Sequence, residues 1–100
     1  MTTLEVTTIN ITRHALLRAL QRSGGSTTGV AMRIIDGVRD ALHDGRHSRQ
    51  KPWWVMGPHE KREETHPSVR YLWDTDEQLV WVVGIASGEA NVITVLRRRR

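Results

Sequence analysis

His14 and Arg18 are the residues of this chain whose types and spacing best suit acid–base chemistry on a phosphate. They stand four positions apart in a segment with helical periodicity, so their side chains should project from one helix face. Histidine takes or gives a proton near neutral pH, and arginine holds a phosphate through two parallel hydrogen bonds. Cleavage of an RNA phosphodiester needs an acid, a base and cations that stabilise the phosphorane. The same spacing also fits two surface side chains that touch only water, so both interpretations stay open.

Thr94 is a second candidate because it places a hydroxyl within the apolar segment 92–96. A regular strand would put Thr94 on one face with Val92 and Leu96, from which its hydroxyl could reach a phosphate. Threonine is also a favoured strand residue in its own right. Thr94 is therefore either an assisting hydroxyl donor or an ordinary residue of the last strand.

Segment 43–51 concentrates positive charge after the second predicted helix. Its potentially cationic residues are His43, Arg46, His47, Arg49 and Lys51. Such a cluster suits contact with a phosphate backbone, and two tryptophans follow it directly. An exposed Trp53 could stack on an unpaired base, whereas at least one of Trp53 and Trp54 should pack into the core. The predicted RNA-binding residues are Arg22, Arg46, His47, Arg49, Lys51 and Trp53.

Composition and charge limit the classes of protein that fit. The chain has 100 residues, no cysteine, and 15 Lys or Arg against 11 Asp or Glu. This length suits one domain, and the lack of cysteine excludes disulfides, a thiolate nucleophile and a Cys-ligated zinc site. Basic residues dominate the stretch 13–51, and acidic residues dominate 60–96. The asymmetry suggests a polyanion partner for the basic half, although two solvated helix faces would produce it as well.

Signals for metal binding, export and membrane insertion are weak. The segment His59–Glu63 departs from the His-Glu-x-x-His pattern at its fifth position, and His43 and His47 lie on either side of Gly45. We therefore predict no metal and no other cofactor. No apolar run approaches the ~20 residues of a membrane-spanning helix, and the first residues lack the order of a signal peptide. A cytoplasmic protein is the expectation.

The predicted helices and strands, which would position these residues, indicate an α+β domain. A short strand is indicated over 4–11, and Thr12 is a suitable N-cap for a helix over 13–22. Apolar residues recurring every four positions predict a second helix over 30–43 that ends at Gly45. Further predicted strands cover 53–56, 69–73, 79–85 and 91–96, with a polar loop over 59–67. We predict two N-terminal helices packed on a three- to four-stranded antiparallel sheet, in a single domain over 1–96 with a flexible Arg tail over 97–100.

The motif Ile11-Thr12-x-His14-x-x-x-Arg18, together with Val92-Ile93-Thr94-Val95 in the last strand, resembles the small toxin domains of the BECR fold. That group takes its name from barnase, EndoU, colicin and RelE relatives, and the likeness covers roughly residues 9–96. The resemblance implies that His14 and Arg18 match the catalytic residues of the first helix and that Thr94 matches the hydroxyl residue of the last strand. It also implies a further basic residue, for which Arg46, Arg49 and Lys51 compete and which His47 could join.

Through this resemblance we expect a metal-independent endoribonuclease toxin that acts on tRNA or mRNA and is neutralised by an acidic antitoxin or immunity protein. Two other classes of protein fit the same residues. One is a non-catalytic nucleic-acid-binding module that uses the basic half of the chain. The other is a small protein-interaction domain whose basic surface binds an acidic partner.

Overall fold

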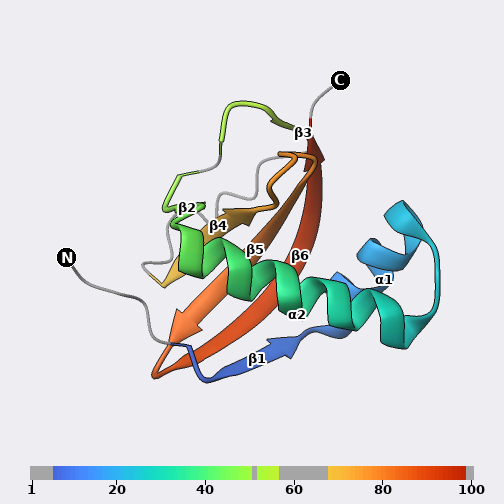
Figure 1. The fold of residues 1–100 in the computed structure, drawn as a ribbon, viewed down its shortest axis with the longest axis horizontal. Coiled ribbons are helices and arrows are strands. Elements are labelled where there is room, and N and C mark those ends of the chain that lie inside the picture. Colours follow the sequence, from blue (N-terminus) through green and yellow to red (C-terminus); the bar gives the residue numbers. More distant parts are fainter. Residues whose placement is uncertain (1–5, 51, 57–67, 99–100) are drawn as a thin grey trace.

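The chain folds into a sheet that carries two helices on one face (Figure 1). The computed structural model describes residues 6–50, 52–56 and 68–98. In chain order the elements are β1 (Thr8–Ile11), α1 (Arg13–Ser23), α2 (Thr27–Asp44), β2 (His47–Ser48), β3 (Val55–Met56), β4 (Val69–Trp73), β5 (Leu79–Ala86) and β6 (Glu89–Arg98). The predicted α+β class is confirmed.

The sheet is larger than predicted and it is mixed. Across the described residues it has six strands in the order β1-β6-β5-β4-β2, and β3 also pairs with β6. β4, β5 and β6 form the expected antiparallel meander, whereas β1 lies parallel to the first half of β6. The prediction of an antiparallel sheet with three to four strands is therefore corrected. β1 also precedes the helices, so the helices are not the first elements of the fold.

Side-chain caps define where both helices begin. The Thr12 hydroxyl accepts a hydrogen bond from the Ala15 amide at 3.1 Å, as the predicted N-cap should. The Ser26 hydroxyl accepts one from the Gly29 amide at 3.0 Å, so α2 starts at Thr27, three residues before the predicted start. α2 ends at Gly45, whose positive φ of 75° is the left-handed cap that glycine favours.

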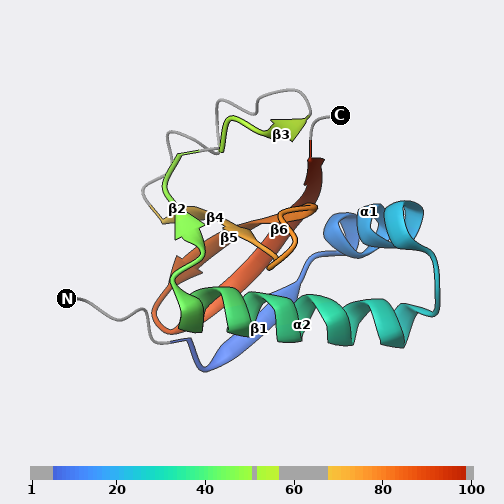
Figure 2. The same ribbon diagram turned by 45° about the horizontal axis from the view of Figure 1, so that its top comes forward.

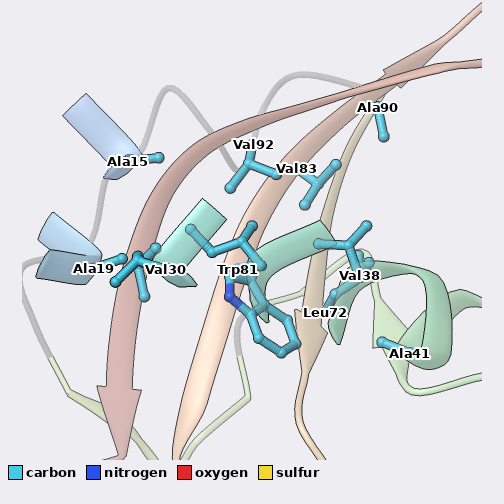
Figure 3. Close-up of a cluster of buried hydrophobic side chains, with 12 residues drawn as sticks. Ala15, Ala19, Val30, Val38, Ala41, Leu72, Trp81, Val83, Ala90 and Val92 are labelled. Carbon is cyan, nitrogen blue, oxygen red and sulfur yellow. The ribbon is translucent and has the colours of Figure 1, made fainter. Parts of the chain in front are cut away.

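Two apolar clusters lie on the two faces of the sheet. The cluster under the helices joins α1 and α2 to β4, β5 and β6, and Figure 3 shows the Trp81 indole between Ala19 and Val30 on one side and Leu72 and Val38 on the other. A Cβ at Gly37 would lie 2.4 Å from the Trp81 ring, so only glycine lets α2 approach Trp81 this closely. The second cluster, on the opposite face, contains Trp54 and Tyr71.

The last strand differs from the prediction in two ways. Its pairing with β5 shifts at a β-bulge, where Val82 pairs with Thr94 and Val83 pairs with Val92, leaving Ile93 as the extra residue. The strand also continues through Arg97 and Arg98, which pair with Met56 and Val55 of β3. Residues 97 and 98, which the sequence assigns to a flexible tail, are thus held in the sheet.

The two short strands that precede β4 differ from the prediction. Trp53 and Trp54 lie in a turn, so β3 covers only the second half of the predicted strand 53–56. A two-residue strand, β2, forms inside the basic segment 43–51 and pairs with β4. The predicted loop over 59–67, the RNA-binding candidate Lys51 and the arginines at 99 and 100 lie outside the described residues.

Candidate functional site

Thr12 fixes the start of α1 against the edge of β6. Its amide donates a hydrogen bond to the Val92 carbonyl at 3.1 Å, and its hydroxyl donates one to the Ile93 carbonyl at 3.1 Å. The last pair between β1 and β6 is Ile11 with Val92, and the two Thr12 bonds follow directly after it. The start of α1 therefore lies along the edge of β6, just beyond the part that β1 covers. The Ile11-Thr12 part of the motif therefore positions His14, two residues further along the chain.

His14, Arg18 and Arg22 form one stripe along α1 because they follow each other at intervals of four residues. All three are exposed. Arg22 lies nearest the sheet, and its Nε donates a hydrogen bond to the Val95 carbonyl at 3.3 Å. The stripe thus runs from solvent at His14 to the backbone of β6 at Arg22.

Arg97 joins this stripe from β6. The pKa of Arg22 is lowered, first by its partial burial and then by repulsion from Arg97 and Arg18. The guanidinium groups of Arg18, on the same helix, and of Arg97, on β6, are therefore each close enough to Arg22 to repel it. We call His14, Arg18, Arg22 and Arg97 the edge cluster.

The edge cluster has no internal counter-charge. The ion pairs seen within residues 6–50, 52–56 and 68–98 join Arg46 to Asp44 and Arg98 to Glu77, and neither involves a member of the cluster. Like charges held together without carboxylates raise the free energy of the folded protein, and a bound anion would relieve the repulsion. The edge cluster is consequently a place where a phosphate would bind favourably.

Thr94 is not brought to the edge cluster. It pairs with Val82, which belongs to the apolar cluster on the face opposite the helices, and it is only 9% exposed. The bulge at Ile93 causes this, because the extra residue turns Thr94 away from the face that Val92 shares with α1 and α2. Thr94 and Val92 therefore lie on different faces, contrary to the alternation expected from the sequence.

The described part of the basic segment, residues 43–50, is also separated from the edge cluster. Arg46 and His47 lie at β2, the far side of the sheet from β1 and α1, and both views of the ribbon place β2 and α1 at opposite ends of the molecule (Figure 2). Three strand spacings separate β6 from β2, which is roughly 14 Å. Of the predicted RNA-binding residues, Arg22 alone is part of the edge cluster.

Arg46 is engaged in holding the fold together. Its Nη1 donates a hydrogen bond of 2.6 Å to the Trp73 carbonyl, and its Nη2 pairs with Asp44 at 3.0 Å. These bonds join the end of α2 to β4. His47 is half-buried in β2, whereas Arg49 is exposed beyond it. Of the two arginines in this segment, Arg46 is therefore structural and Arg49 is open to solvent.

The two adjacent tryptophans behave differently. Trp54 is 8% exposed and packs edge-to-face against Trp73 at 6.3 Å between ring centroids. The Arg98 guanidinium lies over the Trp54 ring at 5.2 Å, a cation–π contact. Trp53 is 80% exposed. It precedes β3, which pairs with Arg97 and Arg98, so Trp53 lies in the chain next to the end of β6 that carries Arg97.

A hollow adjoins the edge cluster on the helix side of the sheet. A cavity of about 80 Å³ lies between α1, α2, β5 and β6, with Ala19, Val30, Trp81 and Val95 among its apolar walls. Arg22 and Arg33 supply its cationic groups. A second cavity of about 260 Å³ continues along α2 toward Arg46 and shares Arg33, Leu79 and Trp81 with the first.

Arg97 is the residue of the edge cluster that sequence reasoning missed. Four consecutive arginines indicate a solvated tail, and the apolar strand pattern ends at Leu96. The register of β6 with β3 and β5 decides otherwise.

No group of three or more His, Cys, Asp or Glu residues in the described ranges has the arrangement of a metal site. No described helix is long and apolar enough to cross a membrane. Comparison with family models, with curated proteins and with solved structures found no match.

Proposed function

We propose that the protein is a metal-independent endoribonuclease whose active site is the edge cluster. The observation that carries this proposal is the gathering of Arg18 and Arg97 around Arg22, without a carboxylate partner among the described residues, beside an exposed histidine. A phosphodiester supplies the missing negative charge. A neighbouring imidazole supplies the proton transfer that cleavage of RNA requires.

The reaction assigned to the site is an internal transesterification. The 2′-oxygen forms a bond to phosphorus and the bond from phosphorus to the 5′-oxygen breaks, which leaves a 2′,3′-cyclic phosphate and a 5′-hydroxyl. The 2′-hydroxyl loses its proton and the leaving 5′-oxygen gains one, and His14 acts in this transfer as base or acid. The guanidinium groups stabilise the two negative charges that develop on the non-bridging oxygens.

The proposal keeps His14 and Arg18 in catalysis and leaves Thr94 out of it. Thr94 lies against the second apolar cluster, and its contribution is to the sheet. Arg22 and Arg97 take the role of the assisting basic residue that the resemblance assigned to segment 43–51. We further propose tRNA or mRNA as the substrate and an acidic antitoxin or immunity protein as the natural partner, as in the toxins of the BECR fold.

The test is cleavage of total tRNA by the purified full chain in excess EDTA. We expect cleavage with cyclic-phosphate ends, and a loss of ~10²–10⁴-fold in rate for His14→Ala. Arg13→Ala is the matched control, because Arg13 is an exposed arginine of the same helix that lies off the stripe. If His14→Ala and Arg18→Ala both cut RNA at the wild-type rate, the edge cluster is not an active site.

A non-catalytic nucleic-acid-binding module is the second candidate function. It is favoured by the burial of Thr94 on the opposite face of the sheet, which leaves the imidazole of His14 as the one general acid or base within the edge cluster. Such a module would bind RNA with a strong dependence on salt and would release no product. The cleavage assay in EDTA therefore distinguishes the two functions.

A further inference from the structure

The cavity between the two helices has a chemistry that RNA cleavage does not use. Apart from Arg22 and Arg33, the residues that line it are apolar, and they come from α1, α2, β5 and β6. An apolar hollow open to solvent holds water that makes few hydrogen bonds, so an apolar group that displaces this water gains free energy.

The size of the cavity favours a branched aliphatic side chain. An apolar cavity of ~150 Å³ in another protein accepts benzene. The present cavity measures about 80 Å³. It therefore suits the side chain of a leucine, isoleucine or valine better than an aromatic ring or a purine.

The two arginines determine the charge of the ligand. Arg33 is exposed, its Nη2 donates to the Gly24 carbonyl at 3.3 Å, and within the described residues it forms no ion pair. Arg22 is crowded by Arg18 and Arg97. Two guanidinium groups beside one apolar hollow complement an apolar side chain that has carboxylates next to it.

A nucleobase fits these walls poorly. Guanidinium groups only donate hydrogen bonds, so they can satisfy the acceptors of a base but not its N–H donors. Donors left unpaired in an apolar cavity would cost most of the free energy gained by burying the ring. An aliphatic side chain carries no such donors.

We propose that the cavity binds an acidic segment of a partner protein, with one branched aliphatic side chain in the hollow and flanking carboxylates on Arg22 and Arg33. Because Arg22 also belongs to the edge cluster, a bound segment blocks the phosphate site. This second step rests on the proposed function, and it makes the partner a competitive inhibitor of RNA cleavage.

The probe is a synthetic peptide with a central leucine between two glutamates on each side, titrated into the full chain and followed by amide chemical shifts. We expect shifts at Ala19, Val30 and Val95. Replacing the leucine of the peptide by serine should weaken binding roughly 10- to 100-fold, the value of one buried leucine side chain. A peptide that moves none of these amides, or that binds equally well without leucine, overturns the proposal.

Arg33→Gln tests the cationic side of the cavity without altering the edge cluster. It should raise the Kd of the peptide by up to about 5-fold, since the ion pair is exposed. Arg39→Gln, at an exposed arginine of the same helix that does not line the cavity, should leave the Kd unchanged. Equal effects of the two variants would show non-specific attraction and overturn the proposal.

The inhibition step has a separate readout. The peptide should slow RNA cleavage by the wild-type chain, and Arg33→Gln should reduce this inhibition while cleavage without peptide stays unchanged. If the peptide binds at Val30 but the chain cuts no RNA, the proposed function fails and the binding site stands. If a single-stranded oligonucleotide shifts Val30 and the peptide does not, the cavity is a base pocket and the inference fails alone.

Discussion

Arg18 and Arg46 lie in two basic regions that are alike in composition and different in structure. Arg18 and Arg97 both stand beside Arg22, and none of the three has a carboxylate partner among the described residues. Arg46 is bonded to the Trp73 carbonyl and to Asp44. An arginine whose charge is balanced by a carboxylate attracts an anion less than arginines that are held close together without a carboxylate. The binding site is therefore identified by the partners of the arginines and not by the number of positive charges in a segment.

The largest expected difference between the two regions is in catalysis. Arg18→Ala should lower the rate of RNA cleavage by ~10²–10³-fold, because it removes a charge that stabilises the transition state. Arg49→Ala, which removes an exposed arginine near β2, should leave the rate close to that of the wild type. Measuring kcat/KM on one tRNA compares them directly. A similar loss for both variants would mean that RNA contacts both regions during catalysis.

Trp53 tests how far the RNA extends from the edge cluster. Its ring is exposed and it lies in the chain next to the end of β6 that carries Arg97, so it can stack on a base that follows the bound phosphate. Trp53→Ala should weaken the binding of a single-stranded oligonucleotide by ~1–3 kcal/mol. Trp53→Phe keeps an aromatic face and should restore most of the affinity. Fluorescence anisotropy in the His14→Ala background measures both without cleavage, and an unchanged Kd for Trp53→Ala would place the RNA elsewhere.

For the free energy of unfolding we expect the opposite ranking, with a larger loss at Arg46 than at Arg18. Arg46→Ala leaves the half-buried Trp73 carbonyl without this donor and should lower the free energy of unfolding by ~1–3 kcal/mol. Arg18→Ala breaks no hydrogen bond that holds the fold and should leave that free energy unchanged or slightly raised, since it relieves repulsion on Arg22. Urea unfolding curves decide between these outcomes. A greater loss of unfolding free energy for Arg18→Ala than for Arg46→Ala would contradict this prediction.

The smallest effect concerns the dependence of binding on salt. Each phosphate contact on single-stranded RNA contributes about 0.7 to the slope of log K against log salt. Removing Arg22 in the His14→Ala background should reduce the slope by about that amount, whereas Arg46→Ala should not change it. Measurements with one oligonucleotide over a range of KCl concentrations test this. Equal changes in slope would show that Arg46 contacts phosphate as well.

Much of the local structure was predictable because its causes are local. Thr12 and Gly45 bound their helices where the sequence indicated, since a side-chain cap or a left-handed glycine acts within one helical turn. The stripe of His14, Arg18 and Arg22 follows from helical periodicity alone. The start of α2 was misplaced because Ser26, the residue that caps it, lies in a connector whose serine and glycine content favours a turn.

The non-local parts of the site were not predictable in this way. The position of Thr94 depends on one extra residue in β6, and a bulge leaves no mark in an apolar β-branched segment. Gly37, which as a helix interior residue costs helical stability, is required by the approach of Trp81 from a distant strand. Arg97 entered the site through its pairing with β3, a partner that the run of four arginines does not reveal.

The order of side chains is enough to predict both helices with the Thr12 and Gly45 caps, the meander of β4, β5 and β6, and the stripe of basic side chains on α1. Periodicity and capping operate over a few residues, so they can be read directly from the order of side chains. Only the tertiary structure decided that β1 runs parallel to β6, that Thr94 faces away from His14, and which arginines are paired. Those outcomes depend on the packing of residues far apart in the chain, where burial and register outweigh local preference.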